Sequence, residues 1–159
     1  EDFRRFRSRS LAWARAGPGA DAGLGQADAI ALRCLDATFL IDYLAGDPAA
    51  LEKAKEWAEA GERLASPAPA VAEALIGAHF RGGAALREAL AFIATFDILP
   101  SDDWVAGEAG RMGADQLRHG ARLSLSDLLI AATTRLNQGI LMTRDRAFGH
   151  VPGLAVETY

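Results

Sequence analysis

The stretch IALRCLDATFLIDYLAG, residues 30–46, decides the fold class of this 159-residue chain. Residues 30–36 form a short apolar run that ends in an acid, which is typical of a buried strand. Residues 37–46 have the apolar spacing of a helix and end in a glycine that stops it. A buried strand followed at once by a helix is the building unit of parallel α/β folds. The rest of the chain is therefore read for repeats of this unit.

The same alternation of short apolar runs and helical segments continues to the end of the chain. Further strands are predicted at 63–66, 97–100 and 140–143, with a possible edge strand at 154–159. Helices are predicted at 48–60, 70–80, 85–96, 102–119 and 125–137, with a short helical turn after Asp145. The pattern indicates a three-layer α/β/α sandwich with a mostly parallel central sheet. In such folds ligands bind beyond the carboxyl ends of the strands.

The composition favours one domain with an extension before it. Half of the residues are hydrophobic, and no apolar run reaches the length of a membrane span. Residues 1–30 are rich in arginine and then in glycine, so we expect an N-terminal extension that is disordered or not native to the protein. Residues 31–159 are expected to form the folded domain.

The charge and the single cysteine exclude several classes of protein. Cys34 stands alone, which excludes a disulfide framework and a cysteine-based zinc site and fits a reducing cytoplasm. The three histidines show no metal-ligand spacing. A net charge of −4 argues against a strongly basic nucleic-acid platform. Nucleic acid is still compatible, because a metal ion can hold the scissile phosphate.

Four acidic residues lie against apolar runs, where a carboxylate is costly. They are Asp36, Glu73, Asp127 and Asp145. No Lys or Arg lies three or four residues from Glu73 or Asp127 on the same predicted helix. Buried acids must be paired, hydrogen-bonded or bound to a cation. Oxygen ligands suit Mg²⁺ or Mn²⁺, so the set predicts one divalent-metal site that supports phosphodiester hydrolysis.

Local capping offers an alternative role for three of these acids. Asp36 stands where it could cap the helix that follows the first strand. Asp127 forms a capping-box pattern with Ser124, and Asp145 could cap the turn after it. Asp42 is expected to be exposed or locally hydrogen-bonded. Glu73 has no such local explanation.

Two arginines flank the last acid in the segment LMTRDRAF. Arg144 and Arg146 stand on either side of Asp145. One interpretation is a surface ion pair, and the other is a pair of phosphate-binding arginines beside the metal site. Both remain open at this point.

The residues quoted above resemble the PIN-domain family, and specifically its VapC-type toxins. The matching pieces are LDATFLIDYL, PAVAEALIG, LSLSDLLIAATT and LMTRDRAFGHVPGLAVETY. The resemblance implies an endoribonuclease that depends on Mg²⁺ or Mn²⁺, with Asp36, Glu73, Asp127 and Asp145 as its acidic quartet. Thr38 and Thr143 match polar residues that accompany the first and last acids. It also implies an RNA substrate, a toxin homodimer and a cognate antitoxin.

Other classes fit less well. A receiver domain needs a lysine after a late strand, and the only lysines are Lys53 and Lys55 on an early helix. A haloacid-dehalogenase-type phosphatase needs an acid at the position of Thr38. A catalytically silent module that binds RNA or a protein stays as the alternative. A further hypothesis is that residues 1–30 dock on the acidic groove, as an antitoxin segment would.

Overall fold

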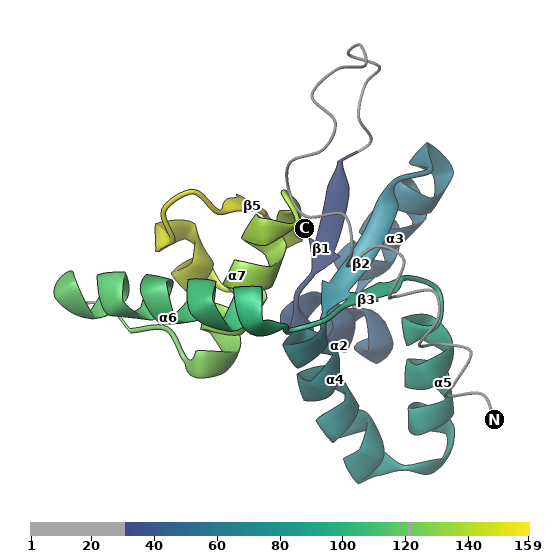
Figure 1. The fold of residues 1–159 in the computed structure, drawn as a ribbon. Helices are drawn as coiled ribbons and strands as arrows, with labels where there is room; N and C mark the ends of the chain where they lie inside the picture. Colours follow the sequence, from purple (N-terminus) through teal and green to yellow (C-terminus); the bar gives the residue numbers. More distant parts are fainter. Residues whose placement is uncertain (1–30, 121) are drawn as a thin grey trace.

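The computed structural model describes residues 31–120 and 122–159. Within them, one five-stranded sheet has the strand order β3-β2-β1-β4-β5, and every neighbouring pair is parallel (Figure 1). The strands are β1 (Leu32–Leu35), β2 (Arg63–Pro67), β3 (Asp97–Leu99), β4 (Ile140–Met142) and β5 (Ala155–Glu157). The sheet is thus parallel throughout, and the predicted last strand is an edge strand.

Helical segments connect the strands. They are α2 (Ala37–Ala45), α3 (Pro48–Ala60), α4 (Ala68–Arg81), α5 (Gly83–Ile93), α6 (Asp103–Arg118), α7 (Leu125–Leu136) and the 3₁₀ helix η1 (Arg146–His150). The predicted elements are confirmed with small shifts of their ends. The helix predicted from residue 70 begins earlier, directly after β2, because Pro67 ends the strand and a second proline fits the first helical turn.

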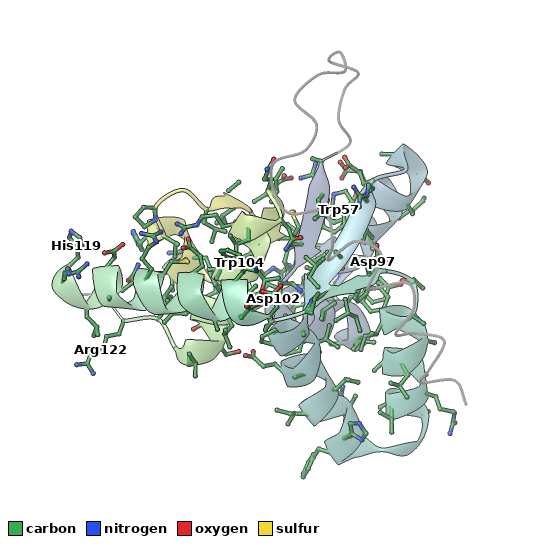
Figure 2. All side chains as sticks on the ribbon, viewed as in Figure 1. Trp57, Asp97, Asp102, Trp104, His119 and Arg122 are labelled. Atoms are coloured by element: carbon green, nitrogen blue, oxygen red, sulfur yellow. The ribbon has the colours of Figure 1, made fainter. Side chains whose placement is uncertain are left out.

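Alternate residues of the central strands face two separate cores. Cys34 of β1 and Leu141 of β4 pack with side chains of α6 and α7. Leu35 and Met142, the next residues along the same strands, pack with side chains of α2, α3 and α4. Figure 1 shows α6 and α7 on one side of the sheet and α3 on the other, and Figure 2 shows Trp57 of α3 beside the strands. The expected three layers follow from this alternation.

One predicted helix face is wrong in part. In the helix predicted at 85–96, Leu86, Leu90, Ile93 and Phe96 fall on one apolar stripe, which predicts a buried face. Leu90, however, is 49% exposed. Ala89 and Ile93 are the buried residues of the helix. The buried face is therefore rotated by about one residue, because α5 packs against α4 and α2 rather than directly on the sheet.

Two expectations bear on other parts of the chain. The extension over residues 1–30, and its suggested docking on the acidic groove, lie outside the described residues. Within the described part of the chain, no helix has the length and apolar character needed to cross a membrane.

Candidate active site

Asp36 occupies the junction between β1 and α2 at the carboxyl edge of the sheet. Only 3% of the residue is exposed. It stands at the N-cap position of α2, as the sequence suggested, but its side chain makes no capping hydrogen bond there. Two hydroxyl groups donate to its Oδ2 instead, Thr38 Oγ1 at 2.9 Å and Thr143 Oγ1 at 2.7 Å. The carboxylate is therefore held by threonines at the end of the strand.

The surroundings of Asp36 disfavour its charge. Burial raises the pKa of its carboxyl above the ordinary value, and the hydrogen bonds from Thr143 and Thr38 offset only part of this. Among residues 31–120 and 122–159, Asp36 forms no ion pair. A buried carboxylate with hydroxyl partners and no paired cation is the situation that a bound metal ion would relieve.

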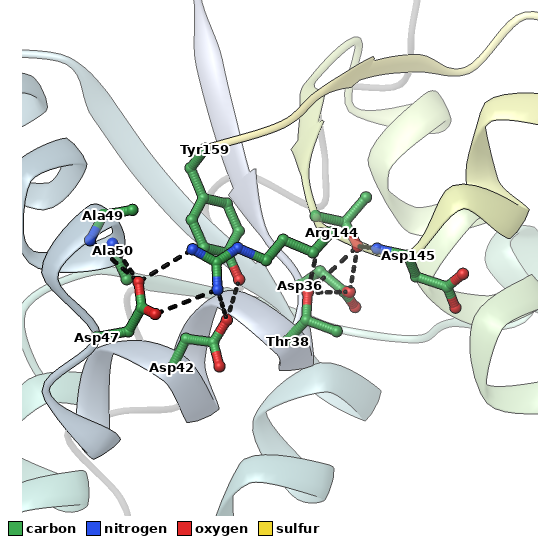
Figure 3. A network of polar contacts seen from close by, with 10 residues as sticks. Asp36, Thr38, Asp42, Asp47, Ala49, Ala50, Arg144, Asp145 and Tyr159 are labelled. Carbon is green, nitrogen blue, oxygen red and sulfur yellow. Dashed lines mark hydrogen bonds and ion pairs between the residues drawn. The ribbon is translucent and has the colours of Figure 1, made fainter.

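The segment after β4 joins this junction because β4 is the parallel neighbour of β1. The backbone N–H of Asp36 donates to the carbonyl of Met142 at 3.2 Å, which brings Thr143 beside it. The N–H of Asp145 donates to Thr143 Oγ1 at 3.0 Å. Asp145 Oδ1 accepts from the N–H of Ala147 at 2.8 Å, so the predicted cap of the following turn is confirmed. Figure 3 shows Asp36 beside Thr38, with the carboxylate of Asp145 directed away from them.

Asp127 begins α7 and completes the predicted capping box. Its Oδ2 accepts from Ser124 Oγ at 2.7 Å and from the Ser124 N–H at 3.2 Å. Its own N–H donates to Ser124 Oγ at 3.1 Å. The cap predicted from the sequence is thus confirmed, and one carboxylate oxygen is occupied by it.

Glu73 reaches α7 from the middle of α4. Its Oε1 contacts the hydroxyl of Ser126, the residue before Asp127. Glu73 is half-buried, and this contact explains how an acid without a helical salt bridge is accommodated. The role of Ser126 was missed from the sequence, because only the packing of α4 against α7 places it there.

The polar contacts connect the four predicted acids only indirectly. Thr143 bonds the carboxylate of Asp36 and the backbone N–H of Asp145, and Glu73 contacts Ser126, the neighbour of Asp127 at the start of α7. In the described part of the chain, no three His, Cys, Asp or Glu side chains lie close enough together to hold a metal ion. The donor chemistry nevertheless fits Mg²⁺ or Mn²⁺, since these ions take oxygen ligands and Mg²⁺ needs only one or two carboxylates besides water and phosphate. Asp36 is the acid best placed to supply one.

The two arginines beside Asp145 differ sharply. Arg146 is exposed and forms no ion pair within the described residues. The guanidinium of Arg144 pairs with Asp42 at 2.9 Å and with Asp47 at 3.0 Å. It also lies 4.5 Å from the centre of the Tyr159 ring. Arg144 is therefore occupied by protein groups, whereas Arg146 faces solvent.

The partners of Arg144 form a network that the sequence did not reveal. Tyr159 donates its hydroxyl hydrogen to Asp42 at 2.8 Å, and Asp47 also accepts the first amides of α3 (Figure 3). Arg144 holds the pKa of Asp47 below its usual range. Burial, together with the bond to Asp42, raises the pKa of Tyr159. Asp42 is half-buried and bonded to distant residues, so its expected exposed or local role is wrong.

The sequence and the fold both define the class of protein. The family model of the PIN domain matches residues 33–154, which is most of the chain. The chain therefore belongs to the PIN-domain family. The search among curated proteins found no sequence similar enough to count as a relative.

Solved structures of toxin–antitoxin systems are similar in fold. The chain shares 16% identity with VapBC2 from Rickettsia felis, with a TM-score of 0.69, covering 80% of this chain and 98% of that one. It shares 26% with VapBC-5 from Mycobacterium tuberculosis, with a TM-score of 0.56 and coverages of 80% and 97%. It shares 18% with VapC20 from Mycobacterium tuberculosis, a sarcin–ricin loop cleaving toxin, with a TM-score of 0.61 and coverages of 79% and 98%. The fold is thus that of VapC-type PIN toxins.

Proposed function

We propose that the protein is a metal-dependent endoribonuclease that acts as the toxin of a toxin–antitoxin pair. The observation that carries the proposal is Asp36, a carboxylate that is buried at the carboxyl edge of a PIN fold, accepts from two hydroxyl groups and has no ion pair among the described residues. A structural acid at this depth would normally be paired with a cation. An acid held ready by hydroxyls instead suits a Mg²⁺ or Mn²⁺ ion as its missing partner.

Each residue of the site has a proposed role. Asp36 and Asp145 would hold the metal ion beside Thr143, while Thr38 and Thr143 orient the carboxylate of Asp36. A bound divalent ion supplies a more acidic water molecule and offsets the negative charge of the scissile phosphate. The other two acids of the predicted quartet, Glu73 and Asp127, each bond a serine through one carboxylate oxygen, so the other oxygen of each would be the one to join the site.

The phosphate backbone of the RNA needs cationic contacts as well. Arg146 is exposed beside Asp145 and is our candidate for a phosphate contact. The guanidinium of Arg144, by contrast, is engaged by Asp42 and Asp47.

The proposed partners follow from the similar structures. VapBC-5 is a member of the VapBC family of toxin–antitoxin systems, and VapC20 is a sarcin–ricin loop cleaving toxin. For this chain we propose an RNA substrate, a cognate antitoxin and a homodimer of the toxin. The alternative is a catalytically silent PIN module that binds RNA or a protein, and the serine-capped state of Asp127 is the observation in its favour.

A thermal-unfolding titration with Mn²⁺ tests the proposal first. Wild type and Asp36→Asn are compared with and without the metal, and with EDTA as a blank. A ligand that binds only the folded state adds about 2.7 kcal/mol of stability at one hundred times its dissociation constant. We expect this stabilisation in wild type and its loss in the variant.

A cleavage assay on single-stranded RNA completes the test. Metal-dependent cleavage by wild type, absent in Asp36→Asn, supports the nuclease. No metal-dependent stabilisation and no cleavage in wild type would overturn it and favour the silent module.

A further inference from the structure

Arg144 lies in the sequence between Thr143 and Asp145, two residues of the proposed site. Thr143 donates to Asp36, and Asp145 is the acid on the other side. The side chain of Arg144 points away from both and enters a cluster formed with Asp42, Asp47 and Tyr159 (Figure 3). We call these four residues the Arg144 clamp.

The clamp is anchored in rigid parts of the fold. Asp47 accepts the N–H groups of Ala49 and Ala50 at 3.0 and 3.1 Å, so the first turn of α3 fixes its carboxylate. Tyr159 packs its ring edge against Phe39, with the ring centres 4.8 Å apart, and Phe39 is a core residue of α2. The segment after β4 is thus tied to the body of the domain through the Arg144 side chain.

The backbone of Arg144 reaches the site directly. Its N–H donates to Thr38 Oγ1 at 3.3 Å, while that hydroxyl lies 2.9 Å from Asp36 Oδ2. A hydroxyl has one hydrogen to donate. The carboxylate of Asp36 can only accept, so the Thr38 hydroxyl donates its hydrogen to it, while the oxygen of the same hydroxyl accepts the N–H of Arg144.

The second threonine is arranged in the same way. Thr143 Oγ1 accepts the N–H of Asp145 at 3.0 Å and lies 2.7 Å from Asp36 Oδ2. Two consecutive amides, those of Arg144 and Asp145, therefore orient the two hydroxyls that hold Asp36. The position of this short backbone segment decides where the carboxylate points.

We propose that Arg144 is a positioning residue: the clamp fixes the amides of Arg144 and Asp145, which orient Thr38 and Thr143 toward Asp36. The inference rests on the proposed nuclease function for its catalytic consequence, but the structural part stands without it. Loss of the clamp would release the segment and let both hydroxyls turn away from the carboxylate. Misplacement by about 1 Å can reduce a reaction rate about 100-fold.

The charge of the clamp argues against the rival role of Arg144 in binding phosphate. One guanidinium faces two carboxylates, so the cluster carries a net negative charge. The guanidinium would have to leave both acids and the face of Tyr159 to meet RNA. Arg146 is exposed and free of such partners among the described residues, and it needs no such rearrangement.

Three variants separate the two roles. Arg144→Gln removes the clamp, and Asp42→Asn weakens it while leaving the arginine in place. Arg111→Gln is the matched control, since Arg111 also bridges two acids, Glu108 and Asp115, but entirely within α6. The first measurement is amide hydrogen exchange at residues 144 and 145. The second is cleavage of a random single-stranded RNA with a fluorophore and a quencher, in Mn²⁺, across a range of salt.

Positioning predicts the same response in both clamp variants. Amide hydrogen exchange at residues 144 and 145 becomes at least about tenfold faster. The kcat for RNA cleavage falls about 10- to 100-fold, and KM stays within about twofold of wild type. The control Arg111→Gln matches wild type in all three measurements. Unchanged exchange in Arg144→Gln overturns the proposal. A second pattern also overturns it. In that pattern, Arg144→Gln has a higher KM and a slope of log affinity against log salt concentration that is smaller by about one, while Asp42→Asn binds RNA more tightly. If wild type cleaves no RNA, the nuclease proposal fails, and the exchange data still decide the clamp.

Discussion

Two charged residues three positions apart, Arg33 within β1 and Asp36 directly after it, have opposite kinds of partners. Arg33 is held by two carboxylates, Glu157 and Glu62, the latter at 3.4 Å. Burial opposes its charge, yet the bonds from both acids raise its pKa above the ordinary value. Asp36, directly after the strand, accepts from the hydroxyls of Thr38 and Thr143 and forms no ion pair among the described residues. The half-buried Arg33 is thus paired with opposite charge, and the buried Asp36 is not.

The difference separates a structural charge from a functional one. A cation paired with acids stabilises the fold as it stands and has no need of a ligand. An unpaired acid lowers stability, and the cost is compensated when a cation binds. We therefore expect changes at Asp36 to act on activity and changes at Arg33 to act on stability. The predictions below test this contrast.

The largest expected effect is on RNA cleavage in Asp36→Asn. The asparagine keeps an oxygen that accepts from both threonines but cannot neutralise a divalent ion. A loss of several kcal/mol of electrostatic stabilisation corresponds to a rate reduction of at least about 1,000-fold. The measurement is kcat in saturating Mn²⁺, with circular dichroism to check the fold.

Asp97→Asn is the matched control, since Asp97 is an exposed acid at the start of β3 (Figure 2). We expect wild-type cleavage from it. Cleavage by Asp36→Asn within about tenfold of wild type would remove Asp36 from the site and end the contrast.

Replacing the structural charge should cost stability instead. Arg33→Met leaves Glu62 and Glu157 without their cation, and we expect a loss of about 1–2 kcal/mol in the free energy of unfolding, because the acids are partly exposed. Adding Glu157→Gln should recover part of this loss, because one of the two unpaired charges is then gone. Denaturant unfolding measures both. Cleavage by the folded fraction should stay at the wild-type level, and a loss of activity without loss of stability would refute the structural role.

Much of this contrast was accessible from the sequence, but not all of it. The run before Asp36 predicted both the strand and the position of the acid at its carboxyl end, and the caps of Asp127 and Asp145 followed from local spacing. These signals lie within a few residues of each other. The partners of Arg144 do not, since Asp42 is 102 positions away along the chain.

Such long-range pairs are set by the order of the strands rather than by local pattern. β4 lies beside β1, and this places the segment after β4 over α2. The same holds for the buried face of α5, which its neighbours α4 and α2 determine. The acids could therefore be predicted from the sequence, whereas their bonding partners depend on tertiary packing.

Cys34, which lies between Arg33 and Asp36 in the sequence, gives a pH-dependent test. Burial raises the pKa of the Cys34 thiol from 9.0 to about 11. Because the folded state holds this proton more tightly, the stability it contributes is complete below pH 9 and is lost as the pH rises toward 11. Two pH units correspond to about 2.7 kcal/mol as an upper bound. The difference in unfolding free energy between wild type and Cys34→Ala should shrink by this order across the window, and a constant difference would contradict the buried thiol.

The smallest expected effect is a loss of thermal stability in Gly139→Ala, a variant that tests how tightly the middle of β1 is packed. A Cβ atom at Gly139 would lie 2.5 Å from Cys34 Sγ and 3.3 Å from the carbonyl oxygen of Leu32. Overpacking of this kind costs about 1–3 kcal/mol, so Gly139→Ala should lower the midpoint of thermal unfolding. Cys34→Ala removes the sulfur that the new methyl group meets. The double variant should therefore lose less stability than the sum of the losses in the two single variants. Losses that simply add would show that the backbone shifts to relieve the clash, so that the sulfur of Cys34 does not matter. Cleavage should persist in the folded fraction, because the clash lies within the sheet and away from its carboxyl edge.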